Sequence, residues 1–204
     1  MDIAVYITAF VTLFVVIDPV GLAPIFVALT PGMSAAERRR IGFRALVIAG
    51  ILMMLFGLAG EAILSAIGIS LPAFRIAGGV LLFLTALDML FERRTERREG
   101  QGHDDRADDP SVFPLAMPLL AGPGALATMI LLAGQQDGWL HLALINIAML
   151  LVLVIAMLLF HLATPLAHAL GRTGTMVVTR LLGMLLAALS IQFVIDGLKG
   201  SGLV

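Results

Sequence analysis

A long apolar run at the start of the chain limits what it can fold into. Between positions 3 and 36 the only charged residue is Asp18. A helix that crosses a bilayer needs roughly 20 apolar residues, so this run is long enough to do so. A charge is expensive at that depth. The run therefore predicts a membrane span with a polar interruption near its middle.

The residues around Asp18 break the helical pattern further. Pro19 and Pro24 have no N–H to donate to the carbonyls one turn earlier, and Gly21 stands between them. Lipid cannot replace those hydrogen bonds, so such a break is tolerated only where it faces protein or a wet cavity. We expect the first span to be broken here and the break to form the wall of a site.

The second half of the chain repeats the proline pattern. Pro118 and Pro123 match the first proline pair at a shift of 99 residues, and Gly122 and Gly124 flank the later proline. This spacing predicts a second broken span.

A further match at a similar shift supports a duplication. At a shift of 105 residues Arg75 aligns with Arg180, each followed three residues later by glycine, and Thr85 aligns with Ser190. Two matches in the same order indicate an internal repeat. A repeat of this length would mean that the fold consists of two similar halves.

Composition assigns the chain to integral membrane proteins. Of its 204 residues 60% are hydrophobic and only 13% charged, whereas soluble domains are about half apolar and a quarter charged. The chain has no cysteine, which excludes disulfides and thiolate metal sites. The first apolar run lacks a basic start and is too long for a cleavable signal peptide, so we expect none.

Hydropathy predicts an all-α membrane protein with six spans. We place them at residues 3–29, 41–67, 73–91, 112–133, 139–162 and 176–198. Residues 92–111 are strongly polar, cannot bury enough surface to fold alone, and are expected to form a mobile cytoplasmic loop. The chain then divides into a first three-span repeat at 1–91 and a second at 112–204.

Arginine placement predicts the orientation. One side of the membrane has only Arg75 and Lys199, while the other side has all the remaining arginines. By the positive-inside rule the arginine-rich loops are cytoplasmic and both termini are periplasmic. Three spans per repeat is an odd number, so the second repeat is predicted to be inverted. Inverted repeats with broken helices are typical of secondary transporters, whose substrate binds near the midplane.

Several residues are candidates for that site. Asp18 either binds a substrate ammonium, a proton or a cation, or caps the half-helix that begins at Pro19; the two roles are compatible. The break at Pro118–Gly124, with Thr128 beyond it, offers free N–H groups to a carboxylate. Glu61 lies inside its span and has either an ion-coupling or a structural role.

Other chemistry has little support in the sequence. His103, Asp104 and Asp105 resemble metal ligands, but in a charge-rich loop they are better explained as solvated chain. We find no catalytic triad, phosphate loop or zinc motif. The sequence therefore predicts no enzyme activity, cofactor or nucleic-acid partner; the expected partners are lipid, a small solute and possible coupling ions, sodium or protons, with the oligomeric state open.

Four segments resemble one known family. Residues 16–26 (VIDPVGLAPIF), 75–79 (RIAGG), 87–90 (LDML) and 114–124 (PLAMPLLAGPG) are similar to the MarC family of bacterial inner-membrane proteins. That resemblance implies a six-span protein, and some relatives are regarded as transporters of small neutral amino acids. The family pattern has Asn or Asp before the first proline, which is Asp18 here.

The leading hypothesis is a secondary transporter of a small polar or zwitterionic solute across the inner membrane. Its site would comprise Asp18, Pro19, Gly21, Pro24 and a second group: Pro118, Gly122, Pro123, Gly124 and Thr128. The alternative is a non-transporting membrane scaffold or a drug-resistance-associated membrane protein of unknown activity.

Overall fold

The computed structural model describes residues 3–91 and 110–202, and every regular element in those ranges is helical. The expected all-α fold is confirmed. In chain order the elements are α1 (Ile3–Ile17), α2 (Pro19–Leu29), α3 (Ala35–Ala66), α4 (Leu71–Leu90), the π-type helix η1 (Ser111–Leu120), α6 (Pro123–Ala133), α7 (Trp139–His161) and α8 (Ala163–Gly200).

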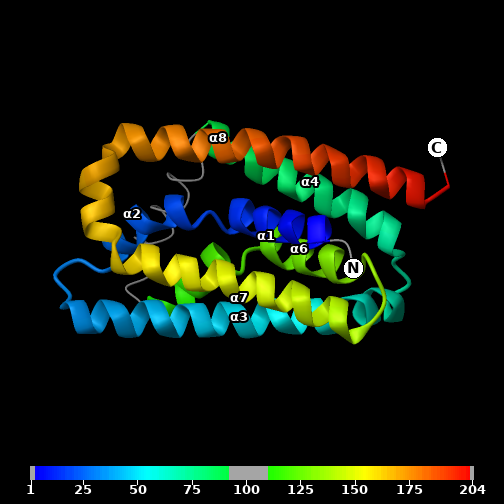
Figure 1. The fold of residues 1–204 in the computed structure, drawn as a ribbon, viewed down its shortest axis with the longest axis horizontal. Coiled ribbons are helices and arrows are strands. Elements are labelled where there is room, and N and C mark those ends of the chain that lie inside the picture. The colour runs from blue at the N-terminus through cyan, green and yellow to red at the C-terminus, as the bar shows by residue number, and fades with distance from the viewer. Residues whose placement is uncertain (1–2, 92–109, 203–204) are drawn as a thin grey trace.

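The helices match the predicted number of membrane crossings. Five are long and apolar enough to span a bilayer when α1 and α2 are taken together, and the bent pair η1 and α6 makes a sixth. The N- and C-terminal ends lie at the same end of the bundle (Figure 1), as an even number of crossings requires. The predicted loop at 92–111 falls almost wholly outside the described residues.

The second span was expected at residues 41–67, and the residues from Ser34 to Glu37 are typical of a capped helix start. That start is confirmed: α3 begins at Ala35, so the arginines that follow lie on the helix ahead of the expected span. The Ser34 hydroxyl accepts from the Glu37 N–H at 3.3 Å, and Glu37 accepts from the Ser34 N–H at 2.8 Å. This capping box satisfies two backbone donors at the start of the helix.

The last span was expected at residues 176–198, and Thr173–Gly200 is long and apolar enough to be that span. Helix α8 begins at Ala163, and Pro165 stands in its first turn, where a missing N–H breaks no hydrogen bond. Gly171 has φ 59°, which redirects the chain there. The segment before Gly171 crosses the end of the bundle, and Thr173–Gly200 then runs its length (Figure 1).

The helices form three layers (Figure 1). Helices α4 and α8 pack together on one side, α3 and α7 on the other, and the broken spans lie between them. The first broken span contacts α7 and α8, whereas the second contacts α3 and α4. Each broken span thus packs on the two unbroken spans of the other half. An inverted repeat requires this exchange, although the repeat and its boundaries at 91 and 112 stay predictions.

Helices α4 and α8 approach closely along a seam of glycines. A Cβ on Gly79 would lie 2.8 Å from both the Ser190 carbonyl oxygen and Val194 Cγ2. A Cβ on Gly183 would lie 3.0 Å from Met89 Cβ. Small residues at helix interfaces allow backbones to approach in lipid, where packing rather than hydrophobic burial drives association.

We expect Gly79→Ala to destabilise the protein by about 1–3 kcal/mol, because the added methyl overlaps a backbone carbonyl that cannot rotate away. Thermal unfolding in detergent would measure the loss. Gly200→Ala is the matched control: its Cβ would lie 3.4 Å from Pro72, an ordinary contact, so this variant should melt no lower than the wild type. Equal melting of the two variants would contradict the packing argument.

The absence of native cysteine allows a direct test of orientation. Asp137 and Pro31 are exposed in turns at opposite ends of the bundle. If the arginine-rich end is cytoplasmic, a membrane-impermeant maleimide should label Asp137→Cys on intact cells, and label Pro31→Cys only after permeabilisation. The cysteine-free chain controls for background. The reverse pattern would invert the predicted topology.

Candidate functional site

The first break lies at Asp18, between α1 and α2. Asp18 has φ 52° and ψ 60°, a left-handed conformation that is uncommon outside glycine, asparagine and aspartate. Hydrogen bonds continue on either side of it: its N–H donates to Phe14 O at 2.9 Å, and its carbonyl accepts from Leu22 N–H at 3.0 Å. The predicted break is confirmed, but α1 and α2 still form one nearly continuous span of 27 residues.

The Asp18 side chain caps the helix that follows. Its Oδ1 accepts from the Gly21 N–H at 3.0 Å, and Pro19 occupies the first helical position. Only 1% of Asp18 is exposed, so the carboxylate points into protein and not toward lipid. A Cβ on Gly21 would overlap the Asp18 carboxylate, which explains the glycine. The predicted capping role of Asp18 is therefore confirmed.

The second break differs in geometry from the first. Helix η1 contains Pro114 and Pro118, both preceded by cis peptide bonds, and has extended residues at Phe113 and Met117. It ends with a wide i to i−5 hydrogen bond from Ala121 N–H to the carbonyl of residue 116, at 2.9 Å. The chain then bends by 54° into α6. The predicted second broken span is confirmed, although the sequence did not indicate the π-type helix within it.

Helix α6 begins without a side-chain cap. Gly122 precedes it, Pro123 occupies its first position, and no side chain accepts from its first turn. Gly124 and Ala125 are buried there. Thr128 is fully buried and its hydroxyl donates to the Gly124 carbonyl at 2.7 Å. The second break therefore presents backbone N–H groups, whereas a carboxylate already covers those of the first.

The two breaks meet inside the bundle. A Cβ on Gly124 would lie 3.8 Å from Val16 Cγ1, 3.3 Å from Leu82 and 3.6 Å from the Thr85 hydroxyl oxygen. Val16 precedes Asp18 by two residues, or about 3 Å along a helix axis. The start of α6, the end of α1 and the middle of α4 thus converge at one place.

Thr85 was not predicted as a site residue. Its hydroxyl donates to the Leu81 carbonyl at 3.0 Å, which leaves the lone pairs of its oxygen beside Gly124. The alignment of Thr85 with Ser190 in the predicted repeat was the one pattern that could have pointed to it. Ser190 is fully buried on α8, and its carbonyl lies against Gly79.

The structure does not bring Glu61 to this place. Its side chain is exposed on α3, while the neighbouring Gly60 faces Ile130 of α6. Successive residues on a helix point about 100° apart, so Glu61 is directed away from α6. Of the two residues expected to couple an ion, only Asp18 lies at the breaks.

Aromatic contacts hold the first broken span to α7 at both of its ends. Tyr6 on α1 packs against His141, with ring centroids 5.7 Å apart and the hydroxyl 3.4 Å from Nδ1. His141 is buried and its Nε2 donates to the Leu132 carbonyl at 2.9 Å. At the opposite end Phe26 stacks on Phe160, with centroids 4.5 Å apart and planes 9° from parallel.

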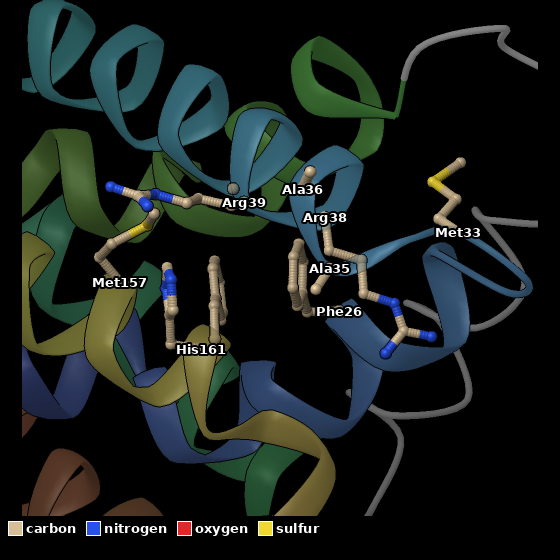
Figure 2. A pocket seen from close by; sticks show the side chains of 10 residues that line it. Phe26, Met33, Ala35, Ala36, Arg38, Arg39, Met157 and His161 are labelled. Atoms are coloured by element: carbon tan, nitrogen blue, oxygen red, sulfur yellow. The ribbon is translucent and has the colours of Figure 1, made fainter.

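A cavity of about 490 Å³ opens beside the second of these contacts. It lies between α2, α3 and α7 at the arginine-rich end, and Figure 2 shows the side chains that line it. Phe26 and Phe160 form part of its wall. Around the breaks themselves the chain is tightly packed: Ile17, Leu22 and Leu120 are fully buried. Asp18 is therefore enclosed by protein.

Comparison with known proteins agrees with this architecture. Residues 3–201 match the family described as MarC family integral membrane protein. The chain belongs to the MarC family.

Curated relatives align with this MarC protein over almost its whole length. A UPF0056 membrane protein of Archaeoglobus fulgidus is 38% identical over 97% of this chain and 96% of its own. YvbG of Bacillus subtilis is 34% identical over 94% and 92%, and YhcE of Escherichia coli is 34% identical over 98% and 94%. No solved structure matches the chain. The relatives are named only as membrane proteins, so the family identifies an integral membrane protein and leaves its activity open.

We expect Asp18→Asn to fold nearly as well as the wild type and Asp18→Ala to fold less well. Asparagine tolerates positive φ and retains an oxygen that can accept from the Gly21 N–H, whereas alanine loses the cap and is strained at φ 52°. The cap alone contributes about 1–2 kcal/mol. Thermal unfolding of the purified variants would measure the difference. Asparagine and alanine variants of equal stability would show that the cap contributes nothing.

Proposed function

We propose that this MarC protein is a secondary transporter of small neutral amino acids or similar small polar solutes. The observation that carries the proposal is a buried carboxylate at a helix break whose neighbouring residue, Val16, contacts a second helix break at Gly124. A buried acid in a membrane span is expensive to keep, and such residues commonly mark the path of a substrate or ion. Two interrupted helices that meet in the bilayer are the usual architecture of a transporter site.

The chemistry of the two breaks suits a zwitterion. Asp18 supplies negative charge for a substrate ammonium, a sodium ion or a coupling proton. The uncapped start of α6, at Gly124 and Ala125, supplies backbone N–H groups and the positive end of a helix dipole for a carboxylate. Pro24 lies inside α2 and leaves the carbonyl one turn earlier without its helical donor, and Thr128 adds a hydroxyl oxygen. Because Glu61 lies elsewhere, we assign coupling to Asp18 alone.

The aromatic contacts fit the role of gates. Tyr6 and Phe26 are 20 residues apart, or about 30 Å along a helix, with Asp18 between them. Tyr6–His141 thus closes one end of the span against α7, and Phe26–Phe160 closes the other. Opening one contact at a time would expose the breaks to one side of the membrane and then to the other.

Charge distribution supports one orientation of this cycle. We assign the arginine-rich end, with Arg38, Arg39 and Arg40, to the cytoplasm, and the chain termini to the outside of the cell membrane. In a bacterial cell this is the inner membrane, with periplasmic termini. Phe26–Phe160 is then the inner gate and Tyr6–His141 the outer one.

Counterflow in proteoliposomes would test the function. Vesicles loaded with unlabelled amino acids should take up labelled glycine or alanine when they contain the wild-type protein. Asp18→Asn should lower uptake by about tenfold or more, because hydrogen bonds to charged groups contribute about 1.5–3 kcal/mol. Uptake with and without sodium or proton gradients would identify the coupling ion.

Asp137→Asn is the matched control, since it removes the same charge from an exposed turn and should transport normally. Normal uptake by Asp18→Asn would remove Asp18 from the mechanism. If the wild type moves none of a panel of small amino acids, the substrate claim fails and the scaffold alternative is favoured.

A further inference from the structure

The cavity at the arginine-rich end contains none of the residues at the helix breaks and is lined by basic and apolar side chains. Among the described residues its lining includes Arg38 and Arg39 from α3 and His161 from α7, and no aspartate or glutamate. Phe26, Phe160 and Met157 supply an apolar wall. A pocket of this kind attracts an anionic group that is attached to something apolar.

The two arginines have different surroundings. Arg38 donates from Nε and one Nη to the Thr30 carbonyl, at 3.2 and 3.0 Å, and so fixes the end of α2 to the start of α3. Arg39 is exposed, and its side chain extends on the same side of the cavity as Met157 and His161 (Figure 2). His161 is exposed as well. Arg39 and His161 therefore offer donors from two different helices at one mouth.

Apolar surface continues from this mouth along both helices. Phe43 follows Arg39 by one helical turn and is 62% exposed; Leu158 precedes His161 by one turn and is 57% exposed. Val47 and Val154 extend these two stripes by a further turn. Helices α3 and α7 pack against each other, and the stripes run from the cationic end toward the middle of the bundle.

We propose that this cavity is a binding site for an anionic phospholipid. The phosphate binds Arg39 and His161, and an acyl chain lies along the exposed residues of α3 and α7. A free phosphate ion would match the same donors, but it would make no contact with the apolar wall or the two stripes. Basic pockets between membrane helices at the cytoplasmic side are suited to anionic headgroups. The site is independent of the transport proposal.

Native mass spectrometry of the detergent-purified full chain would test the site. Phosphatidylglycerol should bind and raise the melting temperature, while phosphatidylcholine and inorganic phosphate should do neither. Arg39→Gln should weaken phosphatidylglycerol binding by about five- to tenfold. Arg40→Gln is the matched control, because Arg40 is exposed on the same helix turn but does not line the cavity. Its affinity should stay within twofold of the wild type.

Each remaining outcome would overturn the proposal. Equal losses in Arg39→Gln and Arg40→Gln would show general attraction to the basic end of the protein. Equal binding of phosphatidylcholine would show that the headgroup charge is irrelevant. A third result would assign the cavity to a soluble anion. In that case inorganic phosphate would bind as tightly as phosphatidylglycerol, and Arg39→Gln would abolish its binding.

Discussion

The hydrogen bond from the Gly21 N–H to the Asp18 carboxylate is the interaction on which the rest of the fold depends. In lipid a chain cannot leave backbone donors unpaired, so a span can be broken only if something in the protein replaces the lost bonds. Aspartate does this in two ways: it accepts positive φ, and its side chain covers the first turn of α2. The capping role requires a side-chain oxygen such as that of a carboxylate. A transporter would need a carboxylate at the same position to bind a cationic group. Structure and proposed chemistry therefore share one residue.

Features encoded locally could be predicted from the sequence. Hydropathy indicated the spans, because a helix buried in lipid must be apolar over its whole length. The Asp18-Pro19 pair indicated a helix start inside the first span, since both residues have intrinsic preferences for those positions. The Ser34 cap was visible for the same reason. Each of these depends on neighbours only a few residues away, and each is present in the structure.

Features that depend on distant partners could not be predicted. The contact between Val16 and Gly124 joins helices from opposite halves of the chain, and no local pattern encodes it. Prolines four residues apart are compatible with simple kinks or with the π-type helix at Ser111–Leu120; packing decides between them. Glu61 lies on a helix that is apolar nearly all round, so periodicity could not indicate which way it points.

The interfaces also differ in how easily they could open. Along α4 and α8 the backbones are nearly in contact at Gly79, and separating them would lose the close packing of Gly79 against Ser190 and Val194. The first broken span is held to α7 by ring contacts, Tyr6–His141 and Phe26–Phe160, and the second of these exchanges one apolar surface for another when the rings part. Movement is therefore expected between the broken spans and α7, while α4 and α8 stay fixed. If the protein transports as proposed, we expect the first broken span to bend at Asp18, where two short helices meet through a single left-handed residue.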